Sequence, residues 1–113
     1  MNNIPQKLKQ ELERDLFYKK CCLTGFTRFK IDWHHCFQFA GSQINEKWNI
    51  IPVWERKHSP QGDKDSIHNC KETRERAELI ALKRAPKDVF IRYKKANFEQ
   101  RLKYLQNKYE KGI

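Results

Sequence analysis

The sequence predicts a small α+β protein, in which a short β-hairpin is buttressed by N- and C-terminal helices. Apolar residues recur at helical spacing near both ends of the chain, and two short apolar segments near the middle have the character of strands. A length of 113 residues with 38% hydrophobic residues suits one domain with a modest core. We therefore expect a single domain over 1–113, composed of an N-terminal helix (1–20), a hairpin core (21–70) and C-terminal helices (71–113).

The N-terminal segment has a helical pattern from Pro5 to Lys19. Proline suits the first turn of a helix, because the N–H that it lacks has no partner there. Leu8, Leu12 and Leu16 recur every four residues, which places them on one face. We expect a continuous amphipathic helix that packs on the later elements.

The middle of the chain predicts two short strands. Residues 29–33 alternate apolar and polar side chains, as a half-buried strand does, and His34 and His35 come at its end. Residues 48–53 are a second short apolar strand. The segment between them, 36–47, is predicted to be a loop with a turn near its glycine.

The remainder is predicted to be helical. In order we expect a turn of helix at 55–58, a break at 59–62, a longer helix capped by Asp65 or Ser66 that runs to about Arg84, a connector at 85–88 and a final helix at 96–109.

The charge is strongly positive. Lys and Arg outnumber Asp and Glu by 24 to 14, a formal net charge of +10. Such a field favours polyanions, so nucleic acid, most of all DNA, is the expected partner, ahead of an anionic membrane surface. Lys30, Arg56 and Lys57 flank the histidines and are the candidate phosphate contacts; each also fits the reading of ordinary solvated charge.

No apolar run approaches the length of a membrane span, and the first residues lack the pattern of a signal peptide. We expect no membrane partner and a cytoplasmic location. Without export, Cys21, Cys22, Cys36 and Cys70 are not expected to form disulfides. Most should be small buried residues, with a zinc-binding role for the last three as the alternative.

The histidines suggest metal-assisted hydrolysis. Successive residues of a strand point to opposite sides, so one of His34 and His35 can hold a metal while the other faces a water. His58 follows the second strand, where the returning chain can bring it to the same ion. Asn49 is expected on that strand, with its amide holding the His35 ring. A neutral imidazole can deprotonate water near neutral pH, and a divalent ion can stabilise the charge of a phosphoryl transition state.

The pattern His34-His35, Gly41, Asn49 to Val53 and His58 resembles the His-Asn-His (HNH) nuclease family, which has the ββα-metal fold. The resemblance implies a DNA endonuclease with His34 and His58 as metal ligands, His35 as general base and Asn49 as the residue that orients it. It implies one divalent ion, magnesium or manganese in use, with zinc or nickel able to bind. The chain is similar to small phage-borne members, for which the location is the host cytoplasm.

Two features depart from that family. Trp54 and Lys57 stand where many members have a cysteine pair, and residues 59–62 interrupt the helix that carries a third ligand. Asp63, His68, water or phosphate are the alternatives for the remaining positions. The alternative function is a zinc-stabilised nucleic-acid-binding module without catalysis. This alternative needs no water-activating residue, and it leaves His35 and Asn49 without a role.

Overall fold

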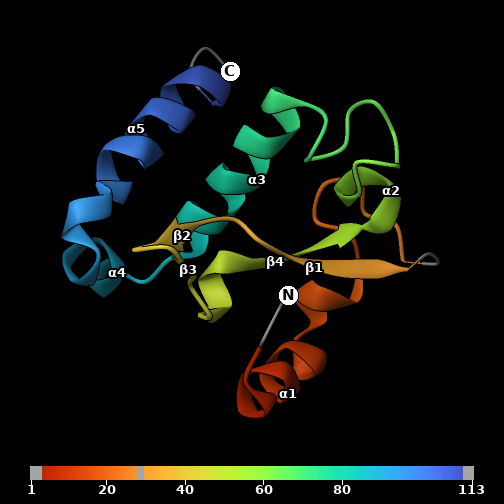
Figure 1. Ribbon diagram of the computed structural model, residues 1–113, viewed down its shortest axis with the longest axis horizontal. Coiled ribbons are helices and arrows are strands. Elements are labelled where there is room, and N and C mark those ends of the chain that lie inside the picture. The colour runs from red at the N-terminus through yellow and green to blue at the C-terminus, as the bar shows by residue number, and fades with distance from the viewer. Residues whose placement is uncertain (1–3, 28–29, 111–113) are drawn as a thin grey trace.

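The structure is a computed structural model that describes residues 4–27 and 30–110. It confirms the α+β class: five helices and two antiparallel two-stranded sheets lie in this part of the chain (Figure 1). The helices are α1 (Gln6–Arg14), α2 (Glu55–His58), α3 (Lys71–Arg84), α4 (Lys87–Arg92) and α5 (Phe98–Tyr109), and the strands are β1 (Ile31–His35), β2 (Gln38–Phe39), β3 (Ser42–Gln43) and β4 (Ile50–Trp54). Three 3-10 turns are η1 (Leu16–Lys19), η2 (Lys47–Asn49) and η3 (Lys94–Ala96).

The N-terminal helix is shorter than predicted. Asp15 has extended backbone (φ −89°, ψ 125°), and its carboxylate accepts the N–H of Phe17 at 2.9 Å. The chain therefore leaves α1 at Asp15 and starts η1. Leu12 stays fully buried, but Leu16 is 82% exposed, so the prediction of one continuous apolar face is wrong beyond the break. An aspartate that competes for backbone N–H groups favours such ends over helix interiors.

The central hairpin pairs β1 with β4 in antiparallel register. Trp33 pairs with Pro52, His34 with Ile51 and His35 with Ile50. Both histidines are thus inside the strand, which extends to His35; the predicted start of this strand, Phe29, lies outside the described residues. β4 begins only at Ile50, after η2.

The predicted loop between these strands contains a second small sheet. β2 and β3 pair across a two-residue turn, in which Ala40 (φ 53°) and Gly41 (φ 81°) both have positive φ. Two positive φ angles are the requirement of the tight hairpin turns that match strand twist. The predicted turn at Gly41 is confirmed, and the prediction of irregular structure throughout 36–47 is wrong.

The long helix starts later than predicted. α2 follows β4 directly, as expected, but residues 64–70 are turns rather than helix. Ser66 N–H donates to the Asp63 carbonyl at 3.1 Å, and Cys70 N–H donates to the Ser66 carbonyl at 2.8 Å. These local bonds replace the predicted cap at Asp65 or Ser66. His68 is therefore on a loop that leads into α3.

The core lies where α3 packs between the hairpin and α5 (Figure 1). Ile51, Val53, Leu82 and Leu105 are fully or almost fully buried there. Glu75 of α3 is buried too, and it accepts hydrogen bonds from Lys108 and Tyr109 of α5. No helix in the described part of the chain is long and apolar enough to span a bilayer.

Candidate metal centre

Three histidines from three elements meet beside the hairpin. His34 lies in β1, His58 ends α2, and His68 is on the loop before α3. One ring nitrogen of each lies within 4.8 Å of those of the other two. The ring centroids are 5.1 Å apart for His34 and His58, 5.8 Å for His34 and His68, and 5.0 Å for His58 and His68. The group could hold a metal ion. His34 and His58 come together as the sequence predicted.

Of the two side chains proposed as a third ligand, His68 is in this group and Asp63 is not. The Asp63 carboxylate instead lies 2.9 Å from a guanidinium nitrogen of Arg56 and 3.2 Å from Nζ of Lys57. These two cations neutralise the carboxylate. The third histidine of the group, His68, therefore comes from the loop after the break at 59–62 and not from α2.

A carboxylate that the sequence reasoning did not identify supports this group. Oδ2 of Asp32 lies 3.0 Å from Nδ1 of His58, which leaves Nε2 of His58 for an ion. Alternation along β1 places Asp32 on the same side as His34, two residues later. A carboxylate on the far nitrogen orients a ligating imidazole and raises its basicity. The spacing Asp-x-His in a predicted strand was the available signal.

Two of the three histidines, His34 and His68, favour the neutral form that metal binding needs. Burial, followed by the charges of His58 and His68, lowers the pKa of His34 to about 3. Burial, followed by His58 and Arg74, also lowers the pKa of His68. Neutral imidazole is the form that binds metals.

His35 lies on the opposite face of β1 from His34 and has a defined tautomer. Its Nε2 lies 2.8 Å from Oδ1 of Asn45, an acceptor, so Nε2 carries the proton and Nδ1 carries the lone pair. Nδ1 is buried, with no hydrogen-bond partner among the described residues. Burial lowers the pKa of His35, with the Asn45 bond opposing. The lowered pKa favours the neutral ring, whose lone pair on Nδ1 is shielded from solvent.

Asn49 is fully buried and holds backbone rather than a ring. Its Nδ2 donates to the carbonyls of Phe37 (3.0 Å) and Ile44 (2.9 Å), and its Oδ1 accepts the N–H of Phe37 at 2.8 Å. The expectation that its amide holds the His35 ring is therefore corrected: Asn45 occupies that position. Asn49, in η2 rather than in the strand, fixes the loop that follows His35.

The three predicted phosphate contacts lie around α2, and each is paired with a carboxylate. Lys30 is 3.8 Å from Glu55 and 72% exposed. Arg56 is bonded to Asp63, as described above, and Lys57 Nζ is 2.6 Å from the Asp65 carboxylate. A phosphate must compete with these partners to be bound here.

The cysteines do not belong to the histidine group. All four are free thiols. Cys21, Cys22 and Cys36 belong to the apolar core, and the Cys36 thiol contacts the carbonyl oxygen of Ala77 at 3.6 Å. The described residues thus form no mixed histidine–cysteine site. The prediction of a small buried side chain is confirmed for Cys21, whereas Cys22 and Cys36 are partly buried against the core.

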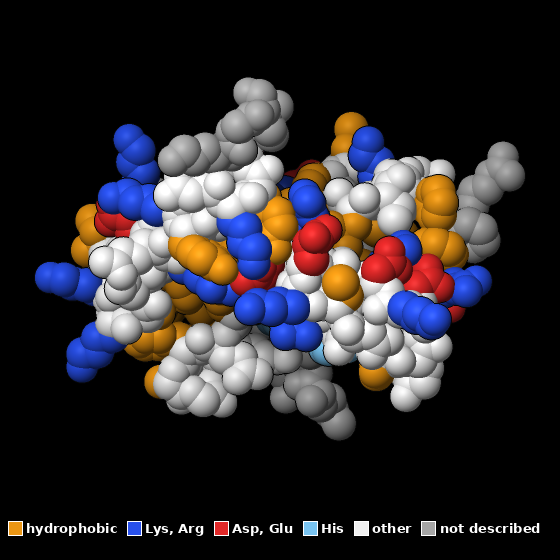
Figure 2. Space-filling model, turned by 90° about the horizontal axis from the view of Figure 1, so that it is seen from above, with side chains coloured by type: hydrophobic (Ala, Val, Ile, Leu, Met, Phe, Trp, Pro, Cys, Tyr) orange, Lys and Arg blue, Asp and Glu red, His pale blue; other side chains and the backbone are white. Residues whose placement is uncertain are grey.

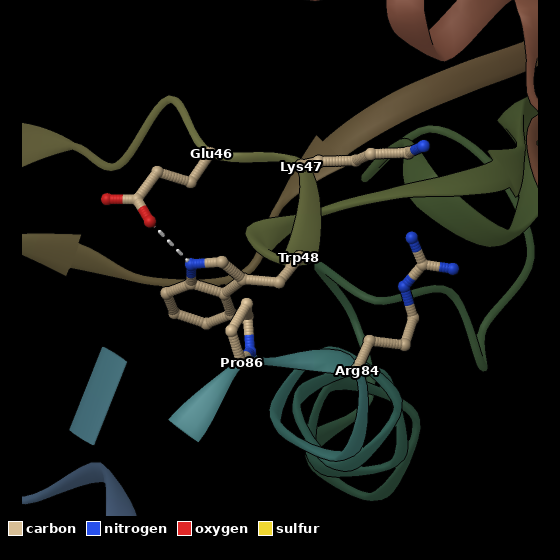
Figure 3. A pocket seen from close by; sticks show the side chains of 5 residues that line it. All are labelled: Glu46, Lys47, Trp48, Arg84 and Pro86. Atoms are coloured by element: carbon tan, nitrogen blue, oxygen red, sulfur yellow. Dashed lines mark hydrogen bonds between the residues drawn. The ribbon is translucent and has the colours of Figure 1, made fainter. Parts of the chain in front are cut away.

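A separate hollow of about 250 Å³ lies between η2 and the end of α3 (Figure 3). Trp48 and Pro86 line it, and Glu46 accepts the indole N–H at 3.0 Å. Lys47 is paired with a carboxylate of the N-terminal segment at 2.7 Å, and Arg84 donates to the Tyr18 hydroxyl at 2.9 Å. These bonds hold η2 against the end of α3 and the N-terminal segment.

Comparisons of the chain with protein-family models, curated proteins and solved structures found no match. Site geometry and sequence pattern are therefore the basis for assigning a function.

Proposed function

We propose that the chain is a metal-dependent endonuclease of the HNH type that hydrolyses phosphodiester bonds in DNA. The convergence of His34, His58 and His68 beside β1 is the observation that carries this proposal. The sequence pattern is a second support, because it points to His34, His58 and His35 and offers His68 as one alternative for the remaining position.

The number of ligands favours catalysis over the alternative, a zinc-stabilised binding module. Structural zinc sites are closed by four protein ligands, whereas catalytic sites have three and keep a position for water or substrate. The group described here has three imidazoles and no cysteine. His68 is also exposed, so the site opens to solvent.

The donor set bears on the choice of metal. Three imidazole nitrogens suit nickel or zinc better than magnesium or manganese, which prefer oxygen ligands. His34, His58 and His68 would hold the ion, with Asp32 orienting His58. When bound, a divalent ion there supplies positive charge for the phosphorane transition state and for the leaving oxygen.

The chain's own residues supply the proton transfer. His35 is the proposed general base, with the lone pair of Nδ1 as the proton acceptor; because this atom is buried, the ring must turn or the segment must open before water can reach it. Asn45 holds the ring through Nε2–H, and Asn49 fixes the loop that follows. A general base at this position contributes about 10²–10⁴-fold to the rate.

The net charge of +10 supports nucleic acid as the substrate. Figure 2 shows Lys and Arg side chains spread across the face that contains the visible histidine surface, with fewer Asp and Glu side chains between them. DNA is the proposed substrate, and cleavage of RNA but not of DNA would redirect the proposal.

The test is nicking of supercoiled plasmid by purified protein with manganese, nickel, zinc or magnesium, and with chelator. We expect nicking with at least one ion and none with chelator. His34→Ala should lose both metal binding and nicking. His35→Ala should lose nicking by about 10²–10⁴-fold and keep its metal. A His35→Ala protein that is folded, metal-loaded and as active as the wild type would contradict the mechanism, and wild type that cuts neither DNA nor RNA would contradict the function.

A further inference from the structure

An arginine on the first turn of α3 is tied to the loop of the third histidine. Nε of Arg74 donates to the carbonyl oxygen of Ile67 at 3.2 Å, and Ile67 directly precedes His68. Ile67 is buried, so this carbonyl is a fixed point. The bond fixes the guanidinium plane next to the histidine group rather than leaving it on a freely rotating side chain.

The remaining nitrogens of Arg74 are unused. Within residues 4–27 and 30–110, neither Nη atom of Arg74 has a hydrogen bond or an ion pair. The cations around it differ: Arg56 and Lys57 are paired with aspartates, and Arg76 lies 3.3 Å from Glu72. Arg74 is thus a guanidinium whose position is fixed and whose charge has no carboxylate to neutralise it.

Arg74 lies beside the histidine group, because the carbonyl that its Nε binds belongs to Ile67, the residue directly before His68. The Lys and Arg side chains beside the histidine surface in Figure 2 are consistent with a positive field at this place. An anion at the histidine group would therefore also meet Arg74.

We propose that Arg74 binds the phosphodiester group of the substrate at the histidine site, through its two Nη groups. The inference rests on the proposed function and names the residue that holds its substrate. Guanidinium presents a planar fork of N–H donors that matches two phosphate oxygens, which an ammonium group does not. Phosphate contacts of this kind fix the register of the nucleic acid and are independent of base sequence. Arg74 would therefore recognise the phosphate group of the substrate and not its base sequence.

The test compares Arg74→Gln with Arg76→Gln, which removes the same charge from the same helix at a cation that is already paired. Binding of a fluorescent duplex oligonucleotide is followed by anisotropy with chelator present, so no cleavage occurs. Arg74→Gln should weaken binding about 10–100-fold, the range for a lost charge-assisted hydrogen-bonded contact. It should also reduce the slope of log K against log salt by about 1. Arg76→Gln should stay within about twofold of the wild type. Equal effects of the two variants would overturn the inference.

Arg74→Lys keeps the positive charge but removes the guanidinium group. It should recover part of the binding but less than wild type, because it lacks the fork. Manganese affinity, measured by calorimetry, tests whether Arg74 acts only by holding His68 in place. If Arg74→Gln loses manganese affinity as much as DNA affinity, Arg74 acts by placing His68 and the inference is wrong.

The two proposals fail in different ways. A wild type that cuts no nucleic acid but binds DNA through Arg74 leaves this inference standing and removes the nuclease. A wild type that cuts, with Arg74→Gln cutting and binding as well as Arg76→Gln, removes only this inference.

Discussion

Oδ2 of Asp32 in β1 lies 3.0 Å from Nδ1 of His58 at the end of α2. His58 comes 26 residues after Asp32 in the chain. The contact fixes the His58 ring, so that Nε2 remains for an ion on the side of β1 where His34 lies. The hairpin therefore positions both a candidate ligand and the group that orients a second candidate ligand.

Replacing Asp32 by Asn should lower metal affinity about 10–100-fold, as loss of an orienting carboxylate does elsewhere. The amide keeps the shape of the side chain but not its charge. Manganese titration calorimetry is the measurement. Asp65→Asn, which changes an exposed carboxylate that faces Lys57, is the control and should bind manganese normally. Equal affinity of Asp32→Asn and wild type would show that the contact does not tune the site.

His68→Ala should weaken metal binding and nicking together, because one of three imidazoles is lost. Asp63→Ala should leave metal affinity within about twofold of the wild type, because its carboxylate pairs with Arg56 and Lys57 and binds no ion. The measurement is manganese affinity for both variants. The opposite ranking would make Asp63 the third ligand.

Asn49 and Asn45 should separate into a structural residue and a residue that positions the His35 ring. Asn49→Ala leaves the Phe37 N–H and two carbonyls without their partner, and should cost about 2–5 kcal/mol in the free energy of unfolding. Asn45→Ala, at an exposed side chain, should cost less than about 1 kcal/mol but lower the nicking rate by releasing the His35 ring. Urea unfolding and plasmid nicking measure the two effects. A stable Asn49→Ala protein with slow nicking would instead support the direct role in catalysis.

The lowered pKa of Glu46 predicts that the stability of the fold depends on pH. Hydrogen bonds from Arg92, then from Tyr93 and Trp48, hold the pKa of Glu46 at about 2, below its usual 4.5. A lowered folded-state pKa stabilises the fold above pH 4.5, and this contribution is lost as the pH falls toward 2. Glu46→Gln should therefore be less stable by about 1–2 kcal/mol at neutral pH, after allowance for screening at the half-exposed Arg92.

The deficit of Glu46→Gln should shrink as the pH is lowered, because the wild-type carboxylate then becomes neutral as well. Urea unfolding at neutral and acid pH measures it. A deficit of the same size at both values would mean that the charge of Glu46 is not what holds the loop.

The local patterns of the chain were enough to predict the fold class and half of the site. Alternation and turn residues located β1, β4 and the turn at Gly41, and spacing selected His34 and His58. These signals are short-range, so they hold wherever local preference and tertiary structure agree.

The sequence predictions were wrong where a side chain makes a hydrogen bond that the local pattern does not reveal. The helical spacing of Leu16 continued beyond Asp15, but the Asp15 carboxylate took the Phe17 N–H and ended the helix. Likewise the sequence pattern assigned the His35 ring to Asn49, and only the tertiary structure shows that Asn45 holds the ring while Asn49 holds the loop.

His68 could be proposed from the sequence but not selected, because its place depends on where α3 begins. A helix that started at Asp65 would have put His68 on its first turn. The turns at 64–70 place it on a loop beside His58 instead.

Titration with Co²⁺, followed by absorption spectroscopy, tests most directly whether His34, His58 and His68 form the metal site. We predict saturation at a single ion per chain, visible d–d bands of a nitrogen- and oxygen-ligated ion, and no thiolate-to-metal charge-transfer band. Each histidine-to-alanine variant should weaken the binding. A thiolate band, or cobalt affinity that survives replacement of all three histidines, would contradict the site on which the proposed nuclease depends.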